Sequence, residues 1–305
     1  MKVGFVYDDV YLMHRPLGFH PERPERLRAI VDVLKANSIW NELIQIKPIK
    51  AEDSLITSVH DVSYLDRVKT ATPGYFDPDT YFSEGSLEAA LSAAGAVVEA
   101  IRMCKEGEIQ RAFCAVRPPG HHAESDRAMG FCIFNNIAIG ARYAQSLGYE
   151  KVFIIDFDVH HGNGTEHMFY EDDSVFYFST HQYPHYPGTG STEERGRGKG
   201  EGFTYNIPMP AGAGDSEYID AYTIKLPELV KQFDPDMVLV SAGYDLHEKD
   251  PLAGIAVTDA GIRAIVRGIL DSKEAIPFVF ALEGGYNLEA LARSVFTTVE
   301  ELLKD

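Results

Sequence analysis

The sequence predicts an α/β fold: one three-layer domain with a mainly parallel open sheet and helices on both faces. Apolar, β-branched or aromatic runs recur along the chain, and helical patterns lie between them. The length of 305 residues suits one large domain, and a content of 45% hydrophobic and 24% charged residues is typical of a globular protein. No repeat, low-complexity tract or Ser/Gly linker divides the chain, so we expect residues 1–305 to form a single domain.

The predicted strands are short apolar runs, and several lack polar alternation, as expected for parallel strands that are buried on both faces. In chain order they are residues 2–7, 112–116, 152–157, 175–179, 237–241 and 278–282. The first run stops at Asp8 and Asp9, which makes it too short for a signal peptide or a membrane span. We therefore expect a cytoplasmic protein without membrane attachment.

Helical patterns lie between the predicted strands. Apolar residues from Leu87 to Ile101 follow the i, i+3, i+4 spacing of an amphipathic helix, and Ser86 is a candidate N-cap for it. Further helices are expected over residues 135–147, 218–233, 259–270 and 287–303. Alternation of strands and helices indicates a doubly wound sheet, in which ligands bind beyond the carboxyl ends of the strands.

The chain carries 28 Lys and Arg residues against 46 Asp and Glu residues, so its formal charge is −18. This balance argues against nucleic-acid binding, which needs clustered Lys and Arg, and it is compatible with a cationic partner. Cys104, Cys114 and Cys132 show no CxxC spacing, which argues against a disulfide framework and a thiolate zinc site. The sequence is as compatible with a homo-oligomer as with a monomer.

Polar segments with chemically capable side chains follow four of the predicted strands. They are residues 117–122, 158–164, 241–245 and 283–286. The carboxyl ends of parallel strands meet at one edge of a sheet, which is where ligands bind in this class of fold. We therefore expect these segments to assemble a single site.

Three titratable residues alternate along one predicted strand and its continuation. Asp156, Asp158 and His160 face the same side, but residues two apart on a strand are separated by roughly 7 Å, so three of them cannot easily share one ion. We expect Asp158 and His160 to bind a metal ion at the strand tip, with Asp156 lying deeper as a supporting carboxylate. A buried aspartate that only caps a loop is the alternative for each residue alone. It does not explain the whole cluster, which is costly to bury without a cation.

Asp245, at the end of another predicted strand, is the best candidate for a further metal ligand, although an aspartate there also fits a helix N-cap or an Asx turn. Two carboxylates and one imidazole leave positions open for water and substrate, which is typical of a catalytic site. Such oxygen-rich ligation suits Zn²⁺ and also admits Fe²⁺, Mn²⁺ or Co²⁺. The sequence therefore predicts a metal centre without settling the metal.

Two adjacent histidines and one tyrosine are further catalytic candidates. His121 and His122 can supply a general base and a second electrostatic group, or form only a structural pair. Their position beside the metal cluster favours catalysis, and Asp156 and Asn163 are candidates for orienting the two rings. Tyr286 follows two glycines and can donate to a developing oxyanion, the alternative being an ordinary amphipathic tyrosine at a helix start.

In these motifs the chain resembles the histone deacetylase superfamily, which has the arginase–deacetylase fold. The matching segments follow one another through nearly the whole chain. They are residues 20–27, 117–123, 130–136, 156–164, 179–181, 187–190, 241–245 and 283–288. Two features resemble the class II branch of the superfamily. One is Asn163, at a position where class I members have Asp, and the other is the segment of residues 282–286. The resemblance implies a metal-dependent deacetylase, a hydrolase that acts on a linear amide C–N bond.

The resemblance also implies roles for the candidate residues. The catalytic Zn²⁺, or Fe²⁺ in the cell, is implied to bind Asp158, His160 and Asp245. A structural K⁺ is implied at Asp156, Ser179 and Thr180. The resemblance implies that His122 is the general base and that His121 is its electrostatic or acid partner. It implies that Tyr286 donates to the oxyanion. The walls of a narrow tunnel that receives an acetylated aliphatic arm are implied to include Gly130, Phe131 and Tyr186.

Relatives of this superfamily act on acetylated lysine in proteins or peptides, or on acetylated polyamines. Polyamine-preferring relatives place an acidic residue near the tunnel mouth, where this chain has the apolar Leu252, which favours acetyl-lysine. Asp79 is a candidate for holding a substrate backbone amide. The alternatives are an acetylpolyamine amidohydrolase of the same mechanism and a non-catalytic acyl-lysine binding module. A dimanganese ureohydrolase-like enzyme would need more bridging carboxylates.

Overall fold

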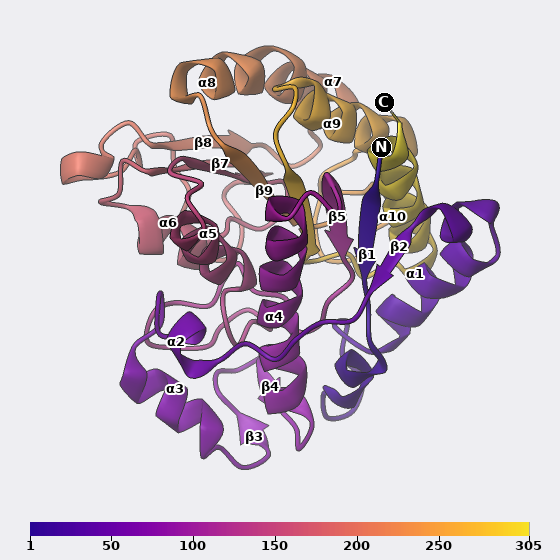
Figure 1. Cartoon of the computed structure of the whole chain (residues 1–305), viewed down its shortest axis with the longest axis vertical. Helices are drawn as coiled ribbons and strands as arrows, with labels where there is room; N and C mark the ends of the chain where they lie inside the picture. Colours follow the sequence, from indigo (N-terminus) through magenta and orange to yellow (C-terminus); the bar gives the residue numbers. More distant parts are fainter. Residues whose placement is uncertain (305) are drawn as a thin grey trace.

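A parallel β-sheet runs through the centre of the computed structural model, which describes residues 1–304 (Figure 1). Within these residues the sheet has eight strands in the order β2-β1-β5-β10-β9-β6-β7-β8, and its neighbouring strands pair in parallel. The strands are β1 (Val3–Val6), β2 (Ile44–Ile46), β5 (Arg111–Cys114), β6 (Val152–Asp156), β7 (Val175–Gln182), β8 (Thr204–Met209), β9 (Met237–Ala242) and β10 (Phe278–Leu282). Both the predicted fold class and the six predicted strands are confirmed.

The two edge strands, β2 and β8, are not predicted from the sequence. β2 has only three residues, too few to show a pattern. β8 contains Pro208, which lacks a backbone N–H and argues against a strand inside a sheet. Proline is tolerated here because β8 pairs only with β7 on one side. This pairing also carries β7 past its predicted end to Gln182.

Helices cover both faces of the sheet (Figure 1). They are α1 (Glu25–Lys35), α2 (Asp53–Ile56), α3 (Val62–Lys69), α4 (Ser86–Lys105), α5 (Asn136–Ser146), α6 (Asn163–Phe169), α7 (Asp215–Asp220), α8 (Leu226–Phe233), α9 (Asp259–Asp271) and α10 (Leu288–Leu303). The shorter elements are η1 (Asp9–Met13), η2 (Ser38–Glu42), η3 (Gly198–Gly200), η4 (Ala221–Lys225) and a hairpin of β3 (Gly74–Tyr75) and β4 (Tyr81–Phe82). α4 and α5 pack together on one face, and α1, α9 and α10 pack together on the other.

Two helices differ from their predictions. Ser86 is the first residue of α4 rather than its N-cap, which is Gly85. A Cβ at position 85 would lie 2.5 Å from Met13 Cβ, so only glycine lets η1 approach α4 this closely. The helix predicted over residues 218–233 is divided into α7, the π-helical turn η4 and α8, because Pro227 lacks the N–H that would continue a regular helix.

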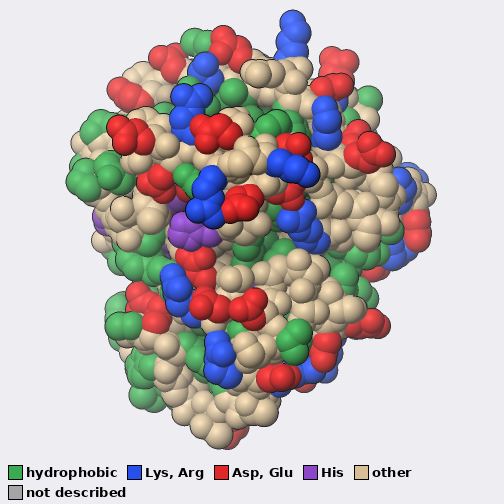
Figure 2. Space-filling view, turned by 90° about the vertical axis from the view of Figure 1, so that its left-hand side faces the viewer, with side chains coloured by type: hydrophobic (Ala, Val, Ile, Leu, Met, Phe, Trp, Pro, Cys, Tyr) green, Lys and Arg blue, Asp and Glu red, His purple; other side chains and the backbone are tan. Residues whose placement is uncertain are grey.

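The helices, the cysteines and the surface charges can be compared with the expectations of a protein without membrane attachment, disulfide framework or nucleic-acid binding. None of the helices in residues 1–304 has the length and apolar character needed to cross a membrane. Cys104, Cys114 and Cys132 are free and buried. On the face that Figure 2 shows, Lys and Arg side chains lie among Asp and Glu side chains rather than gathering in one basic patch.

Candidate active site and metal centre

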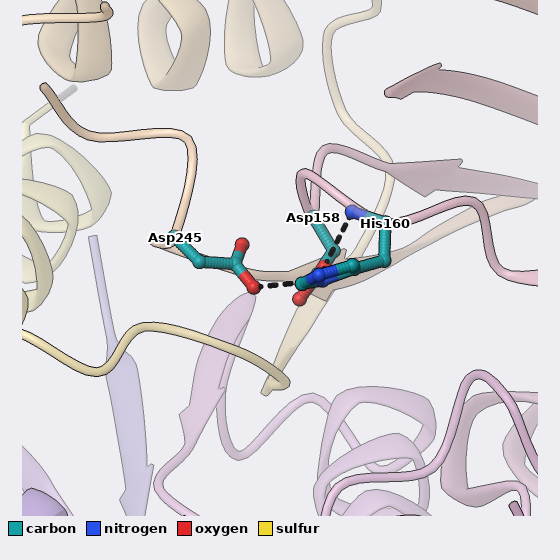
Figure 3. A group of neighbouring side chains, drawn as sticks. All are labelled: Asp158, His160 and Asp245. Carbon is teal, nitrogen blue, oxygen red and sulfur yellow. Dashed lines mark hydrogen bonds and ion pairs between the residues drawn. The ribbon is translucent and has the colours of Figure 1, made fainter. Parts of the chain in front are cut away.

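Three side chains from two loops meet at the carboxyl edge of the sheet (Figure 3). Asp158 and His160 follow β6, and Asp245 follows the neighbouring strand β9. His160 Nδ1 lies 3.0 Å from Asp158 Oδ1 and 3.1 Å from Asp245 Oδ2, and one ligand atom from each residue lies within 4.8 Å of the others. The structure thus brings together the three residues that the sequence suggests as metal ligands.

Backbone groups hold the two carboxylates in place. Gly284 N donates to Asp158 Oδ2 at 2.7 Å, and Val159 N donates to Asp245 Oδ1 at 3.0 Å. A Cβ at position 284 would lie 2.1 Å from Asp245 Oδ2, so only glycine lets the loop after β10 come this close. Asp245 Oδ2 is buried and, apart from its ion-pair contact with His160 Nδ1, has no partner within residues 1–304, which leaves it available as a ligand.

This donor set fits a divalent cation. Burial alone would lower the pKa of His160, but the carboxylates of Asp158 and Asp245 outweigh it and raise the pKa. Burial together with the Asp158 carboxylate raises the pKa of Asp245. Both shifts reflect an excess of buried negative charge, which a cation would neutralise. One imidazole and two carboxylates suit Zn²⁺, and they also accommodate Fe²⁺, Mn²⁺ or Co²⁺.

The adjacent histidines have separate partners. His121 Nδ1 lies 2.9 Å from Asp156 Oδ2, and His122 Nδ1 lies 2.8 Å from Asn163 Oδ1. Burial would lower the pKa of His121, but nearby carboxylates, above all Asp156, raise it to about 10. Burial and the neighbouring His121 hold the pKa of His122 well below its ordinary value. The pair therefore combines a cationic and a neutral imidazole, which suits an acid and a base.

The residues suggested for K⁺ are only partly brought together by their side chains. Asp156 on β6 lies directly opposite Ser179 on β7. The hydroxyl of Thr180 instead lies 2.8 Å from the hydroxyl of Tyr222, and Ser179 Oγ lies 2.9 Å from His181 Nδ1. The structure therefore brings Asp156 and Ser179 side by side, while the hydroxyl of Thr180 is engaged by Tyr222.

A cavity of about 270 Å³ opens beside the metal ligands. It is lined by Asp79, Pro119, His121, His122, Gly130, Phe131, His160, His185, Tyr186, Leu252, Gly284 and Tyr286. All the residues suggested to bind substrate are in this set. Pro119 and His185 are additions that sequence reasoning misses; the His185 ring stacks on the ring of His160 with centroids 5.2 Å apart.

The backbone and ring of Tyr286 are both held in place. Its N–H donates to Asp250 Oδ2 at 2.6 Å, and the Arg26 guanidinium lies 5.0 Å from the centroid of its ring. Phe131 packs edge-on against the same ring at 5.9 Å. Burial and the nearby Asp245 carboxylate hold the pKa of Tyr286 well above its ordinary value, so the hydroxyl stays protonated and can donate.

Several supporting acidic residues are missed by sequence reasoning. Glu283 Oε2 accepts hydrogen bonds from the backbone N–H groups of Gly120 and His121, which fixes the turn before the histidine pair. Asp250 holds the Tyr286 loop, and Glu124 lies behind Asn163. These contacts join loops that are distant in the chain, so the sequence pattern contains no signal for them; only the resemblance marks residues 20–27 and 283–288 as segments of interest.

Two buried arginines connect the N-terminal segment to this edge of the sheet. Arg117 donates to Glu22 Oε2 at 2.7 Å and to the Tyr11 carbonyl oxygen at 2.8 Å. Arg26 donates to Glu22 Oε1 at 3.1 Å and to the Gly285 carbonyl oxygen at 2.7 Å. Burial would raise the pKa of Glu22, but the contacts with Arg117 and His14 hold it well below its ordinary range. The carboxylate is therefore ionised in the interior.

Replacing Arg117 with Met should lower the free energy of unfolding by about 3–5 kcal/mol, because a buried carboxylate loses its main partner. The loss should shrink as the pH falls below about 4.3, the ordinary pKa of a glutamate in an unfolded chain. Below that pH Glu22 is protonated in the unfolded state, and the stability that its depressed pKa gives the folded state is progressively lost in the wild type as well. Urea unfolding at neutral and acidic pH measures both effects. Arg197→Met, which removes an exposed pair with Glu171, is the control and should leave the free energy of unfolding close to that of the wild type. An equal, small change in both variants would contradict the prediction.

A buried ligand set for a cation, placed beside oriented imidazoles at the edge of an α/β sheet, is typical of metal-dependent hydrolases. Residues 20–302 match the histone deacetylase domain. The chain belongs to the histone deacetylase family, which confirms the resemblance seen in the sequence motifs.

Known members are similar along the whole chain. Histone deacetylase 5 of Arabidopsis thaliana is 39% identical over 326 residues, which cover 100% of this chain and 49% of that protein. A probable deacetylase of Methanothermobacter thermautotrophicus is 42% identical over 295 residues, which cover 95% and 87% of the two chains. The crystal structure of the HDA15 HD domain matches with a TM-score of 0.95 at 37% identity, over 99% of this chain and 91% of that one. The chain thus spans about half the length of the first plant relatives it matches.

Proposed function

We propose that this protein is a zinc-dependent amidohydrolase that removes acetyl groups from acetylated lysine side chains and releases acetate. The observation that carries the proposal is the cavity, which has the ligand His160, the His121–His122 pair and Tyr286 in its wall. A non-catalytic acyl-lysine binding module would need none of these three features. The family membership supports the same reaction class.

The residues divide the reaction among them. Phe131 and Tyr186 enclose the aliphatic arm of the substrate between aromatic surfaces. Zn²⁺ held by the three ligands would supply Lewis-acid polarisation of the amide and a water of lowered pKa. His122, which is neutral, accepts a proton from the attacking water, and Tyr286 donates a hydrogen bond to the carbonyl oxygen as negative charge develops there. The cationic His121 provides positive charge and a proton for the leaving amine.

Further parts of the proposal concern ions, organisation and environment. We propose that Fe²⁺ can replace Zn²⁺ in the cell, because the ligand set accommodates both. A structural K⁺ at Asp156, Ser179 and Thr180 is supported by the opposed positions of the first two residues. A cytoplasmic location is supported by three free, buried cysteines, and a single catalytic domain over residues 1–305 by one eight-stranded sheet whose strands run from β1 (Val3–Val6) to β10 (Phe278–Leu282). Neither nucleic acid nor membrane is proposed as a partner.

Leu252 supports acetyl-lysine over an acetylated polyamine as substrate. It lines the cavity, where a cationic polyamine would leave its charge beside an apolar side chain. Asp79 also lines the cavity and is proposed to accept a hydrogen bond from a substrate backbone amide, a group that a polyamine lacks.

Zinc-loaded protein should hydrolyse an acetyl-lysine peptide with a kcat/KM about tenfold or more above that for N-acetylputrescine, a difference of about 1.4 kcal/mol. Longer acyl-lysines in the same panel define the acyl limit. Leu252→Glu should narrow the ratio by favouring the cationic substrate, and Leu252→Gln is the uncharged control. A wild-type preference for N-acetylputrescine would reverse the assignment to an acetylpolyamine amidohydrolase. Lack of turnover on all substrates would favour the binding module.

A further inference from the structure

The two histidines of the pair differ in how strictly their partners define the tautomer. Asp156 can only accept a hydrogen bond, so His121 Nδ1 must carry a proton. Asn163 can accept through Oδ1 or donate through Nδ2, so this carboxamide alone does not decide which nitrogen of His122 is protonated. A general base near the metal ligands must be in one particular tautomer, so a group other than the Asn163 carboxamide must impose that tautomer.

A second carboxylate lies directly behind Asn163. Asn163 Nδ2 donates to Glu124 Oε1 at 2.6 Å, and His167 Nδ1 lies 2.9 and 3.1 Å from the two oxygens of Glu124. The side chain of Glu124 is 8% exposed and that of His167 is 45% exposed, so the contacts run from the interior to the surface of α6. Burial would raise the pKa of Glu124, but the contact with His167 outweighs it and lowers the pKa. Glu124 is therefore ionised and can only accept.

These contacts transmit an orientation from one residue to the next. An ionised Glu124 requires Asn163 to direct Nδ2 towards it. Asn163 Oδ1 then faces His122 and accepts the proton of Nδ1, which leaves His122 Nε2 unprotonated. An unprotonated ring nitrogen is what a general base needs, and a wrong tautomer has no lone pair there.

We propose that Glu124 is a positioning residue that acts through Asn163 to hold His122 in the tautomer protonated at Nδ1. The inference rests on the proposed function, because the tautomer matters to turnover only if His122 accepts a proton during hydrolysis. Glu124 is not among the residues that line the cavity. In the His121 pair a single carboxylate holds the proton on Nδ1, whereas in the His122 pair a neutral amide and the carboxylate behind it together decide which nitrogen carries the proton.

Glu124→Leu should lower kcat about 10- to 100-fold with little change in KM, because Asn163 Nδ2 loses its shortest and only charged acceptor and keeps the longer contacts with Met129 Sδ at 3.3 Å and the His122 carbonyl oxygen at 3.5 Å. Glu124→Gln should cause a smaller loss, since glutamine can accept from Asn163 but does not enforce that direction. Glu171→Gln changes an exposed glutamate just beyond α6 that pairs with Arg197, and it should leave kcat unchanged. Metal content and circular dichroism are measured for each variant.

An exchange of the two side chains provides the most specific test. Asn163→Asp alone places two carboxylates in contact and should lower kcat. Combined with Glu124→Gln it should recover most of the lost activity. In the double variant the introduced carboxylate would accept from His122, while the introduced carboxamide behind it donates to that carboxylate. The inference would be overturned if the losses of kcat in the two single variants added up in the double variant. Wild-type kcat in Glu124→Leu with normal metal content would overturn it as well.

A spectroscopic measurement separates the inference from the proposed function. In zinc-loaded, ¹⁵N-histidine-labelled protein at neutral pH, the ring shifts of His122 should show a protonated Nδ1 and an unprotonated Nε2, and Glu124→Leu should shift both towards a tautomer mixture. A wild-type ring protonated at Nε2 would refute the role of Glu124 whatever the activity. Absence of turnover by wild-type protein together with the expected shifts would instead count against deacetylation alone.

Discussion

Replacing Asp245 with Asn is expected to abolish stable metal binding and to lower kcat/KM about 10³-fold or more. The substitution keeps the shape of the side chain but removes one of the two carboxylate charges of the ligand set. Within residues 1–304 the partner of Asp245 Oδ2 is the ring of His160, so an amide there would keep a buried polar group but lose the charge that attracts a cation. Metal analysis after dialysis, together with kinetics, measures both losses.

A matched control for this variant lies at the other end of the same strand. Asp236 precedes β9, accepts a hydrogen bond from the backbone N–H of Lys151 and is far along the strand from the metal ligands. Asp236→Asn should retain about one metal ion per chain and wild-type turnover. Full metal content in Asp245→Asn would show that the cation binds elsewhere, and full turnover in the absence of metal would contradict metal-dependent hydrolysis.

Replacing Tyr286 with Phe should lower kcat about 10²–10³-fold while leaving metal content near that of the wild type. The substitution removes only the hydroxyl, so the ring contacts with Phe131 and Arg26 and the backbone bond to Asp250 remain. The lost group is a protonated donor at the cavity wall, which is expected to bind the carbonyl oxygen more strongly as charge develops on it.

The effect of this variant should be seen in kcat more than in KM, because the hydroxyl interacts mainly with the transition state. Tyr75→Phe, which alters an exposed tyrosine of β3, is the control for removal of a tyrosine hydroxyl and should retain wild-type kinetics. Unchanged kcat in Tyr286→Phe would remove Tyr286 from the catalytic residues. A parallel loss of metal would assign it a role in building the site instead.

Local spacing was sufficient to separate Asp156 from Asp158 and His160 as candidate metal ligands. The period of a strand separates Asp156 from the strand tip, and the structure accordingly places Asp156 against His121 while Asp158 and His160 meet Asp245. The strand-end rule also anticipated that loops after β6 and β9 converge, because these strands are parallel neighbours. Both expectations depend on backbone geometry that is the same in every parallel sheet.

Residues that orient the site could not be found in this way. Glu124 lies 39 positions from Asn163 and Glu22 lies 95 positions from Arg117, and no periodicity relates residues so far apart in the chain. The edge strand β8 escaped prediction for a related reason: Pro208 is acceptable only because nothing pairs with the outer side of that strand within the described residues. These features depend on which segments become neighbours.

The sequence by itself determined the α/β class, the parallel strands and the candidate residues at their ends, because the local chain geometry imposes periodicity and direction on each segment. Only the tertiary structure decided which oxygen of Asp245 faces His160, which carboxylate stands behind Asn163 and that Pro119 and His185 join the cavity wall. Hydrogen-bond direction and burial are properties of groups brought together by folding, and in this protein the charge state and tautomer of each catalytic candidate follow from them.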